Sequence, residues 1–134
     1  MKVVGFDGRE YSWNLVNHVP LFDDERSRSK LHIKVRGVLT ELFPFDRILE
    51  EVPLPGSGKR SLVADFCVPS RKLIIEAHGK QHYEFNSFHY KNHLEFLHAQ
   101  SRDRRKKEWC DLNQITLIEL SYKESENEWR TKIT

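Results

Sequence analysis

The stretch ADFCVPSRKLIIEAHGKQH, residues 64–82, decides how this chain is expected to fold. Two short apolar segments within it read as β-strands, and the turn between them begins at Pro69. Asp65 lies in the first of these strands and Glu76 in the second. Because a carboxylate is costly to bury without a partner, we expect a metal ion or a strong ion pair to hold these two acids.

The remaining elements alternate helices and strands around this stretch. An apolar stripe of helical period that ends at Pro44 predicts a first helix, and Asp7-Gly8 between two short apolar segments predicts an N-terminal β-hairpin. The strand-helix-strand crossover near the end implies an α/β sheet covered by helices. In chain order we expect a hairpin within 3–13, a helix at 29–42, strands at 47–54, 62–68 and 73–77, a helix at 93–112 and a strand at 115–120.

Length and composition predict a single domain of 134 residues, with an N-terminal hairpin extension at 1–25, a core at 27–121 and a polar tail at 122–134. Trp129 is the expected anchor of that tail. No run approaches the roughly 20 apolar residues of a membrane span, and the N-terminus lacks the apolar centre of a signal peptide. Two cysteines are too few for a disulfide framework, so we expect a protein of the reducing cytoplasm without a membrane partner.

The acids and imidazoles of residues 64–82 fit phosphodiester hydrolysis. Side chains on neighbouring strands approach to about 5 Å, so Asp65 and Glu76 can share one Mg²⁺ ion, or Mn²⁺ in its place, with the backbone carbonyl of Ala77 as a further ligand. His78 lies two residues after Glu76 and therefore on the same face of the strand. His78 and His82 are both candidates to accept a proton from water or donate one to the leaving group.

An acid on one strand followed by acid-x-base on the next resembles the PD-(D/E)xK nuclease superfamily. Within it, the chain resembles the very-short-patch repair endonucleases and the phage homing endonucleases of the EDxHD group. The residues that carry this likeness are Asp65-Phe66, then Pro69 and Ile75, then His78-Gly79 followed shortly by a second histidine. The likeness covers roughly residues 27–121. It implies a restriction-endonuclease-like fold, with a small mixed β-sheet flanked by helices, and Mg²⁺-dependent cleavage of DNA inside a bacterial or phage-infected cell.

The resemblance also implies roles for individual residues. Asp65 would be the central metal ligand, His82 would act on water or metal-bound water, and Asp103 would brace or complete the site from the late helix. Gln81 would orient substrate or water. His32 lies where many of these relatives have glutamate, and it is more similar to the helix histidine of RecB-like nucleases.

The chain departs from the family pattern in three ways, which affect the choice of the residue that acts as general base. Glu76 supplies a second acid that very-short-patch enzymes lack, and their zinc-binding cysteines are absent here. His78 replaces the lysine that usually stands two residues after the acid, although Lys80 is within reach of the same place. The choice between His78 and His82 as the proton-handling residue therefore stays open.

Basic residues gather at both expected helices. The run 102–107 holds five basic residues and one acid, which on a helix is most often a solvated face. Beside a nuclease centre, however, two basic patches on a chain of net charge +2 predict a phosphate-binding face. The candidate DNA contacts are Lys30, Lys34, Lys80, Arg102, Arg104, Arg105, Lys106 and Lys107.

The same residues admit other interpretations. Glu50 and Glu51 are interpreted as solvated carboxylates rather than essential ligands, and Glu41 is left open. A non-catalytic DNA-binding module on a degenerate nuclease fold is the main alternative. A zinc-binding domain using both cysteines with His78 and His82 matches no familiar zinc spacing. An RNA substrate, nicking against double-strand cleavage, and a homodimer are not decided by the sequence.

Overall fold

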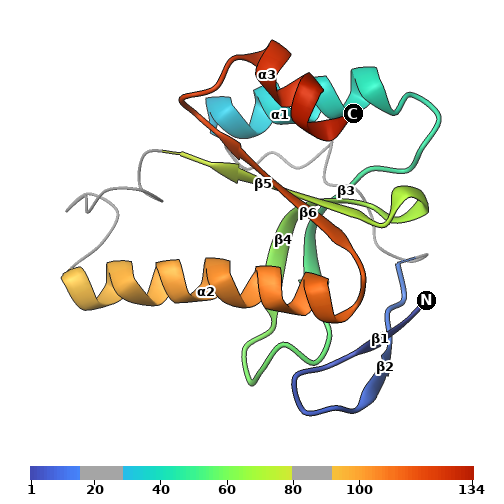
Figure 1. Ribbon diagram of the computed structural model, residues 1–134, viewed down its shortest axis with the longest axis vertical. Helices are drawn as coiled ribbons and strands as arrows, with labels where there is room; N and C mark the ends of the chain where they lie inside the picture. Colours follow the sequence, from blue (N-terminus) through green and yellow to red (C-terminus); the bar gives the residue numbers. More distant parts are fainter. Residues whose placement is uncertain (16–28, 80–91) are drawn as a thin grey trace.

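A four-stranded mixed sheet forms the centre of the computed structural model, which describes residues 1–15, 29–79 and 92–134 (Figure 1). The strand order is β3-β4-β5-β6, with antiparallel pairing from β3 to β5 and a parallel pair of β5 with β6. The strands are β3 (Leu49–Leu54), β4 (Leu62–Val68), β5 (Leu73–His78) and β6 (Thr116–Ser121). A 3₁₀ turn (Pro69–Arg71) joins β4 to β5.

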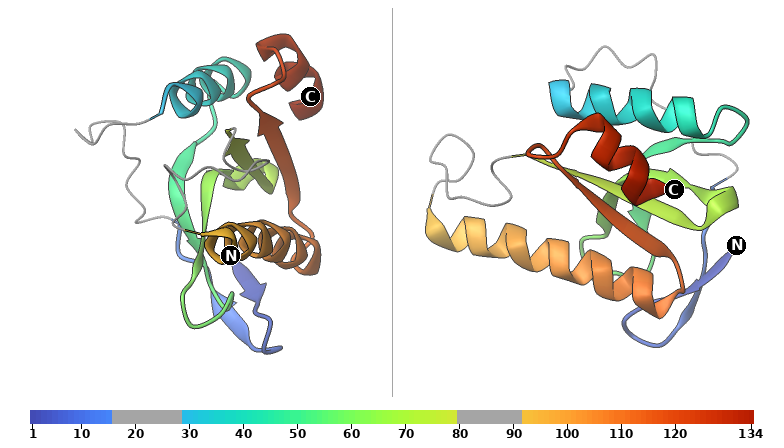
Figure 2. Two further views of the ribbon diagram at one scale, coloured as in Figure 1. Left: turned by 90° about the vertical axis from the view of Figure 1, so that its left-hand side faces the viewer. Right: turned by 45° about the horizontal axis from the view of Figure 1, so that its top comes forward.

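Helices cover both faces of this sheet. Figures 1 and 2 show α1 (Lys30–Leu42) and α3 (Glu126–Ile133) on one face and α2 (His93–Leu112) on the other. Because α2 connects β5 to its parallel neighbour β6, it forms the crossover that the sequence predicts. A separate hairpin of β1 (Lys2–Val4) and β2 (Glu10–Ser12) precedes the sheet. Within the described residues, no helix is both long and apolar enough to cross a membrane.

Each sheet face has its own apolar core. Toward α1 and α3, Phe66, Ile75 and Leu120 pack with the buried stripe of α1. Toward α2, Ile74 packs with Trp109, and the hairpin joins this core through Trp13. The two tryptophan rings meet edge to face with centroids 5.2 Å apart.

The two long helices are held differently. Ser29 caps α1 by accepting a hydrogen bond from the His32 amide at 3.1 Å. In α2, Trp109 and Cys110 near the C-terminal end are the buried residues, whereas the preceding turns are polar and more exposed. Within this polar stretch Asp103, Arg105 and Lys106 are half-buried whereas Arg104 and Lys107 are exposed, so one side of the helix turns polar side chains toward the rest of the protein.

Most of the predicted elements are confirmed within one or two residues at their ends. The C-terminal segment is the exception, because residues expected to form a polar tail include helix α3. Trp129 of this helix is 2% exposed and its Nε1 donates to the Ser121 carbonyl at 3.0 Å, which confirms its role as an anchor. The sequence also predicts a loop over the candidate site at 83–91, and these residues lie outside the described part of the chain.

The strand pair β3-β4 is irregular at its centre. Register pairs on either side place Glu51 opposite Asp65, and Glu51 has a φ of 52°, in the left-handed region. Ala64 and Cys67 both belong to the α2-side core although they are three positions apart, so the side-chain alternation of β4 shifts around Asp65. Backbone of this kind is sparsely populated by residues other than glycine and is often found at functional sites.

Candidate active site

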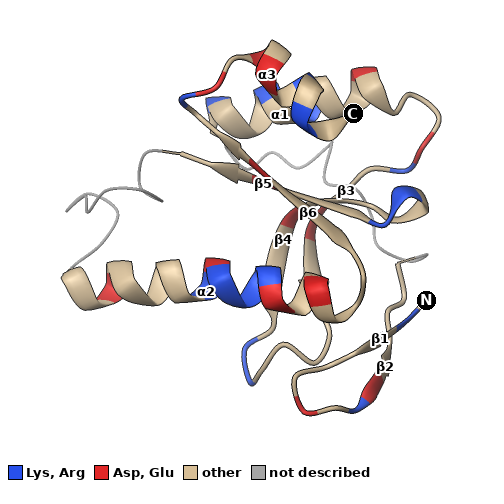
Figure 3. Ribbon diagram, viewed as in Figure 1, with Lys and Arg blue, Asp and Glu red and all other residues tan. Residues whose placement is uncertain are grey.

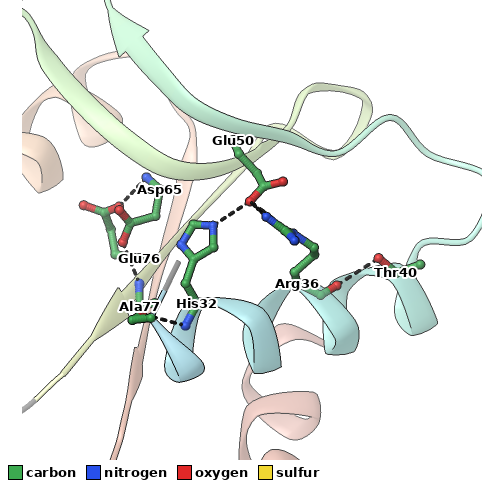
Figure 4. Close-up of polar contacts among 8 residues, drawn as sticks. His32, Arg36, Thr40, Glu50, Asp65, Glu76 and Ala77 are labelled. Atoms are coloured by element: carbon green, nitrogen blue, oxygen red, sulfur yellow. Dashed lines mark hydrogen bonds and ion pairs between the residues drawn. The ribbon is translucent and has the colours of Figure 1, made fainter. Parts of the chain in front are cut away.

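Strands β4 and β5 lose their regular pairing at Asp65 and Glu76. Ladder pairs run from Val68 and Leu73 to Phe66 and Ile75, and the next position would set the two acids opposite each other. There, the Asp65 amide donates to Glu76 Oε2 at 2.7 Å, and the Ala77 amide donates to Asp65 Oδ2 at 2.9 Å (Figure 4). The carboxylates thus replace the backbone acceptors of the ladder, and both side chains are fixed where the strands diverge.

A group of metal-ligand type forms beside this point. Among the described residues, Glu76, His78 and Asp103 each offer a ligand atom, and these atoms lie within 4.8 Å of one another. Glu76 and His78 are buried and Asp103 is half-buried. The expectation that His78 shares a face with Glu76 is confirmed, and α2 brings Asp103 to the same place. His78 Nδ1 also lies 3.7 Å from Glu119 Oε2 on β6.

Lys106 completes the arrangement from the next turn of α2. Its ammonium donates to Glu76 Oε1, and it also feels the charges of Asp65 and Asp103. Residues three apart on a helix share a face, so Asp103 and Lys106 both turn toward the sheet. We refer to Asp65, Glu76, His78, Asp103 and Lys106 as the strand-end cluster.

Burial governs the charge of Glu76. Burial, and after it the charge on Asp65, raise the pKa of this carboxyl to about 8 although Lys106 opposes both effects. Burial by itself would lower the pKa of Lys106, but the charge and hydrogen bond of Glu76 outweigh it, so that pKa is raised. Within the strand-end cluster, the single ammonium of Lys106 faces three carboxyl groups.

A divalent cation fits this imbalance. Fully ionised, three carboxylates and one ammonium leave a net charge of about −2 at the cluster, which one divalent ion neutralises. Glu76 and Asp103 offer the carboxylate oxygens that Mg²⁺ and Mn²⁺ prefer, whereas Asp65, the expected central ligand, is not part of the group of ligand atoms within 4.8 Å. An imidazole nitrogen from His78 is a ligand for transition metals and therefore favours Mn²⁺ over Mg²⁺ at this set.

A second ionic group lies between α1 and β3. Glu50 Oε1 contacts His32 Nε2 at 2.5 Å and Arg36 Nη2 at 2.8 Å, and the His32 ring stacks on Phe66 (Figure 4). Burial raises the pKa of Glu50, but its bonds to Arg36 and His32 outweigh this and leave the pKa below its usual value. The interpretation of Glu50 as a solvated acid is therefore wrong, because its side chain is fully buried in an ion pair.

The other candidate acids and the cysteines have different surroundings. Glu41, left open by the sequence, pairs with Arg130 at 2.6 Å on the surface. Burial raises the pKa of Cys67 and of Cys110 to about 12 each, which keeps both thiols protonated. Within the described residues, the group of possible metal ligands consists of Glu76, His78 and Asp103 and includes neither cysteine.

The predicted DNA-contacting residues separate into several environments. Lys30 and Lys34 are exposed on α1, across the sheet from α2. On α2, Arg102, Arg104 and Lys107 are exposed, whereas Lys106 turns inward. Arg105 Nη2 donates to the Ser57 carbonyl at 2.5 Å and its guanidinium lies 5.7 Å from the centre of the Phe6 ring.

Three of the candidate site residues, Lys80, Gln81 and His82, lie outside the described residues. Lys106 was assigned from the sequence to DNA contact alone, and its pairing with Glu76 was missed. A signal for it exists in the spacing, because Lys106 follows Asp103 by three residues on the same helix. That signal becomes specific only once α2 is known to pack over the end of β5.

No protein-family model matches this chain. It is 39% identical over 66 residues to the uncharacterized protein 307L of Invertebrate iridescent virus 6, an overlap of 49% of this chain and 34% of that protein. It is 37% identical over 70 residues to the uncharacterized protein 033L of Invertebrate iridescent virus 3, covering 52% of this chain and 34% of the relative. The chain thus matches about a third of the length of each of these two viral proteins.

Proposed function

We propose that this chain is a DNA endonuclease of the PD-(D/E)xK type, dependent on Mg²⁺ or Mn²⁺, on a restriction-endonuclease-like fold. One observation carries the proposal: Glu76, His78 and Asp103 converge within 4.8 Å, beside the point where Asp65 and Glu76 separate β4 from β5. The mixed sheet with helices on both faces is compatible with such a fold.

The side chains support distinct tasks in phosphodiester hydrolysis. Asp65, Glu76 and Asp103 would hold the divalent ion, and the bound ion would supply Lewis-acid stabilisation of negative charge on the phosphoryl group. Lys106 holds a proton at Nζ beside the same carboxylates and can neutralise the leaving oxygen. His78 is buried next to them, and its ring can accept the proton that the attacking water loses.

The cost of the cluster favours an enzyme over a purely DNA-binding module. Buried carboxylates destabilise a fold unless something compensates them, and apolar residues of similar volume are often neutral or stabilising replacements. Glu76 is 2% exposed and Lys106 alone does not balance the acids around it. A module that binds DNA through surface arginines does not need these interior acids for binding.

Plasmid cleavage tests the proposal. Wild type and the variants Glu76→Gln and Asp103→Asn would be incubated with supercoiled DNA at low salt, with Mg²⁺, Mn²⁺ or EDTA. Asp111→Asn is the matched control, because Asp111 lies two turns further along α2 and is exposed. We expect the wild type to produce nicked or linear DNA only when Mg²⁺ or Mn²⁺ is present. The cleavage rate should fall at least about 100-fold in both cluster variants and stay unchanged in the control.

Two results would overturn the assignment. Cleavage that persists in EDTA or in the cluster variants would place the activity elsewhere, including in a contaminating nuclease. Intact plasmid under all conditions, together with a gel shift that wild type and variants share, would favour the DNA-binding module. A parallel series with single-stranded RNA distinguishes the sugar of the substrate.

A further inference from the structure

A basic cleft of about 470 Å³ lies beside the strand-end cluster, between α2 and the chain that enters β4. Arg60 and Ser61 line it from the β4 side, and His98, Ser101 and Arg102 line it from α2. Figure 3 shows basic positions on the middle of α2 and on the loop before β4. The described residues that line the cleft include basic, hydroxyl and apolar side chains but no acid.

The cleft is continuous with the candidate centre through one side chain. Lys106 lines the cleft and also donates to Glu76, so a group bound in the cleft lies next to the cluster. Arg105 forms another part of the wall and is held in place by its bond to the Ser57 carbonyl. Arg60 and Arg102 are exposed and face the opening from opposite sides.

We infer that this cleft binds the sugar-phosphate backbone of the nucleic acid strand beside the phosphate that is cut. Guanidinium groups bind phosphate oxygens through paired hydrogen bonds, and hydroxyl groups of serine are common additional phosphate donors. An open, positively charged groove without acids tracks a polyanionic backbone rather than a single small ligand. This inference rests on the proposed function for the identity of the polyanion and adds Arg60, Ser61, His98 and Ser101 to its binding surface.

Binding measured without cleavage tests the cleft separately from the chemistry. The anisotropy of a fluorescent 30-base-pair duplex would be titrated in EDTA with wild type, Arg60→Gln, Arg102→Gln and the double variant, over a range of salt. Arg71→Gln is the control for net charge. Arg71 is exposed and follows the C-terminal end of β4, whereas Arg60 precedes the N-terminal end of the same strand. The control therefore removes one positive charge at the opposite end of β4 from the cleft.

We expect each cleft variant to bind at least about tenfold more weakly than wild type, which corresponds to about 1.4 kcal/mol, because each substitution removes a charge-assisted hydrogen bond to phosphate. The slope of log affinity against log salt should fall by about 0.9 for each phosphate contact removed. Arg71→Gln should stay within about twofold of wild type. Thermal unfolding of each variant would establish that the exposed substitutions leave the fold intact.

The outcomes separate the two proposals. If the double variant binds DNA with the same affinity and the same salt slope as wild type, the proposal that the cleft binds the backbone is overturned, whether or not the protein cuts DNA. An equal loss in Arg71→Gln also overturns it, because net charge then explains the binding. If the cleft variants bind DNA more weakly than wild type, but wild type never cuts DNA, the result supports the cleft as a binding surface and overturns the nuclease assignment.

Discussion

Asp65 and Glu76 each accept a backbone hydrogen bond at the position where their strands would otherwise pair with each other. The Asp65 amide donates to Glu76 at 2.7 Å, and Asp65 accepts from the amide of the next residue, Ala77, at 2.9 Å. The two acids therefore stabilise the divergence of the strands as well as forming part of the candidate centre. Substitutions at Asp65 can separate these two roles.

Asp65→Asn and Asp65→Ala should differ in stability. Asparagine keeps an oxygen that can accept from the Ala77 amide, whereas alanine leaves that amide without its acceptor, at a cost of about 1–3 kcal/mol. Both variants should lose Mn²⁺ binding measured by isothermal titration calorimetry. Equal stability of the two variants in chemical denaturation would show that the backbone bond contributes nothing.

Glu76 should make the metal-free protein less stable as pH rises. In the unfolded chain this carboxyl loses its proton near the ordinary pKa of 4.5, whereas in the folded protein burial holds the proton until about pH 8. The folded state thus binds more protons between these values, and this contribution to stability is lost as pH rises through about 8. The free energy of unfolding would be measured in EDTA for wild type and for Glu76→Gln from pH 5 to 8.5. As pH rises, the stability of wild type should fall relative to that of the variant. A difference that is independent of pH would contradict the raised pKa.

Lys106→Met should destabilise the protein and strengthen its response to divalent ions. Removing the ammonium leaves Glu76 buried without its cation, at a cost of about 1–3 kcal/mol above about pH 8, where that carboxyl is ionised. Because the cluster then carries more net negative charge, Mn²⁺ should raise the melting temperature of Lys106→Met more than that of wild type. Lys107→Met, at the exposed neighbouring position, should change stability by less than about 0.5 kcal/mol. A metal response no larger than that of wild type would place the ion away from Lys106.

Glu50→Gln should reduce stability by about 2–3 kcal/mol without any dependence on metal. Glu50 is fully buried and holds Arg36 and His32, so its loss leaves a cation without its carboxylate. Glu41→Gln offers the matched comparison, because Glu41 pairs with Arg130 on the surface, where ion pairs contribute about 0–1 kcal/mol. If Mn²⁺ restored the stability of Glu50→Gln, the role of Glu50 would be in metal binding instead.

Glu51 offers a test of backbone strain beside the site. Its φ of 52° suits glycine far better than alanine, so Glu51→Gly should be more stable than Glu51→Ala by about 1 kcal/mol. Both variants remove the same carboxylate, and their difference therefore reports on the backbone alone. Equal unfolding midpoints in urea would mean that the strand relaxes to ordinary geometry at no cost.

The sequence predicts most of this fold because its patterns are local. Strand β4 and helix α2 are expected at the residues where they occur, since apolar alternation, helical period and capping are visible in short windows. Helix α3 was missed because only Trp129 is buried in a short polar segment, which gives little periodic signal. Glu51 was missed for another reason: nothing in its neighbours indicates left-handed backbone in a strand.

The site is predictable to the extent that it lies on one strand. Glu76 and His78 share a face because of their spacing, and Asp65 follows from the turn that joins its strand to theirs. The inward direction of Lys106 and the burial of Glu50 depend on which helix covers which face of the sheet. Such long-range packing does not show in the residues around either position.

The crossover through α2 links the candidate chemistry to the completion of folding. The meander β3-β4-β5 joins segments close in the chain, whereas the pairing of β5 with β6 must wait for the whole of α2. Contacts that close long stretches of chain form late because of their entropic cost. Asp103 and Lys106 thus reach Glu76 only when the domain is nearly complete. A nascent or partly unfolded chain would carry Asp65 and Glu76 but lack a competent centre, so the protein would acquire any cutting activity only with its finished structure.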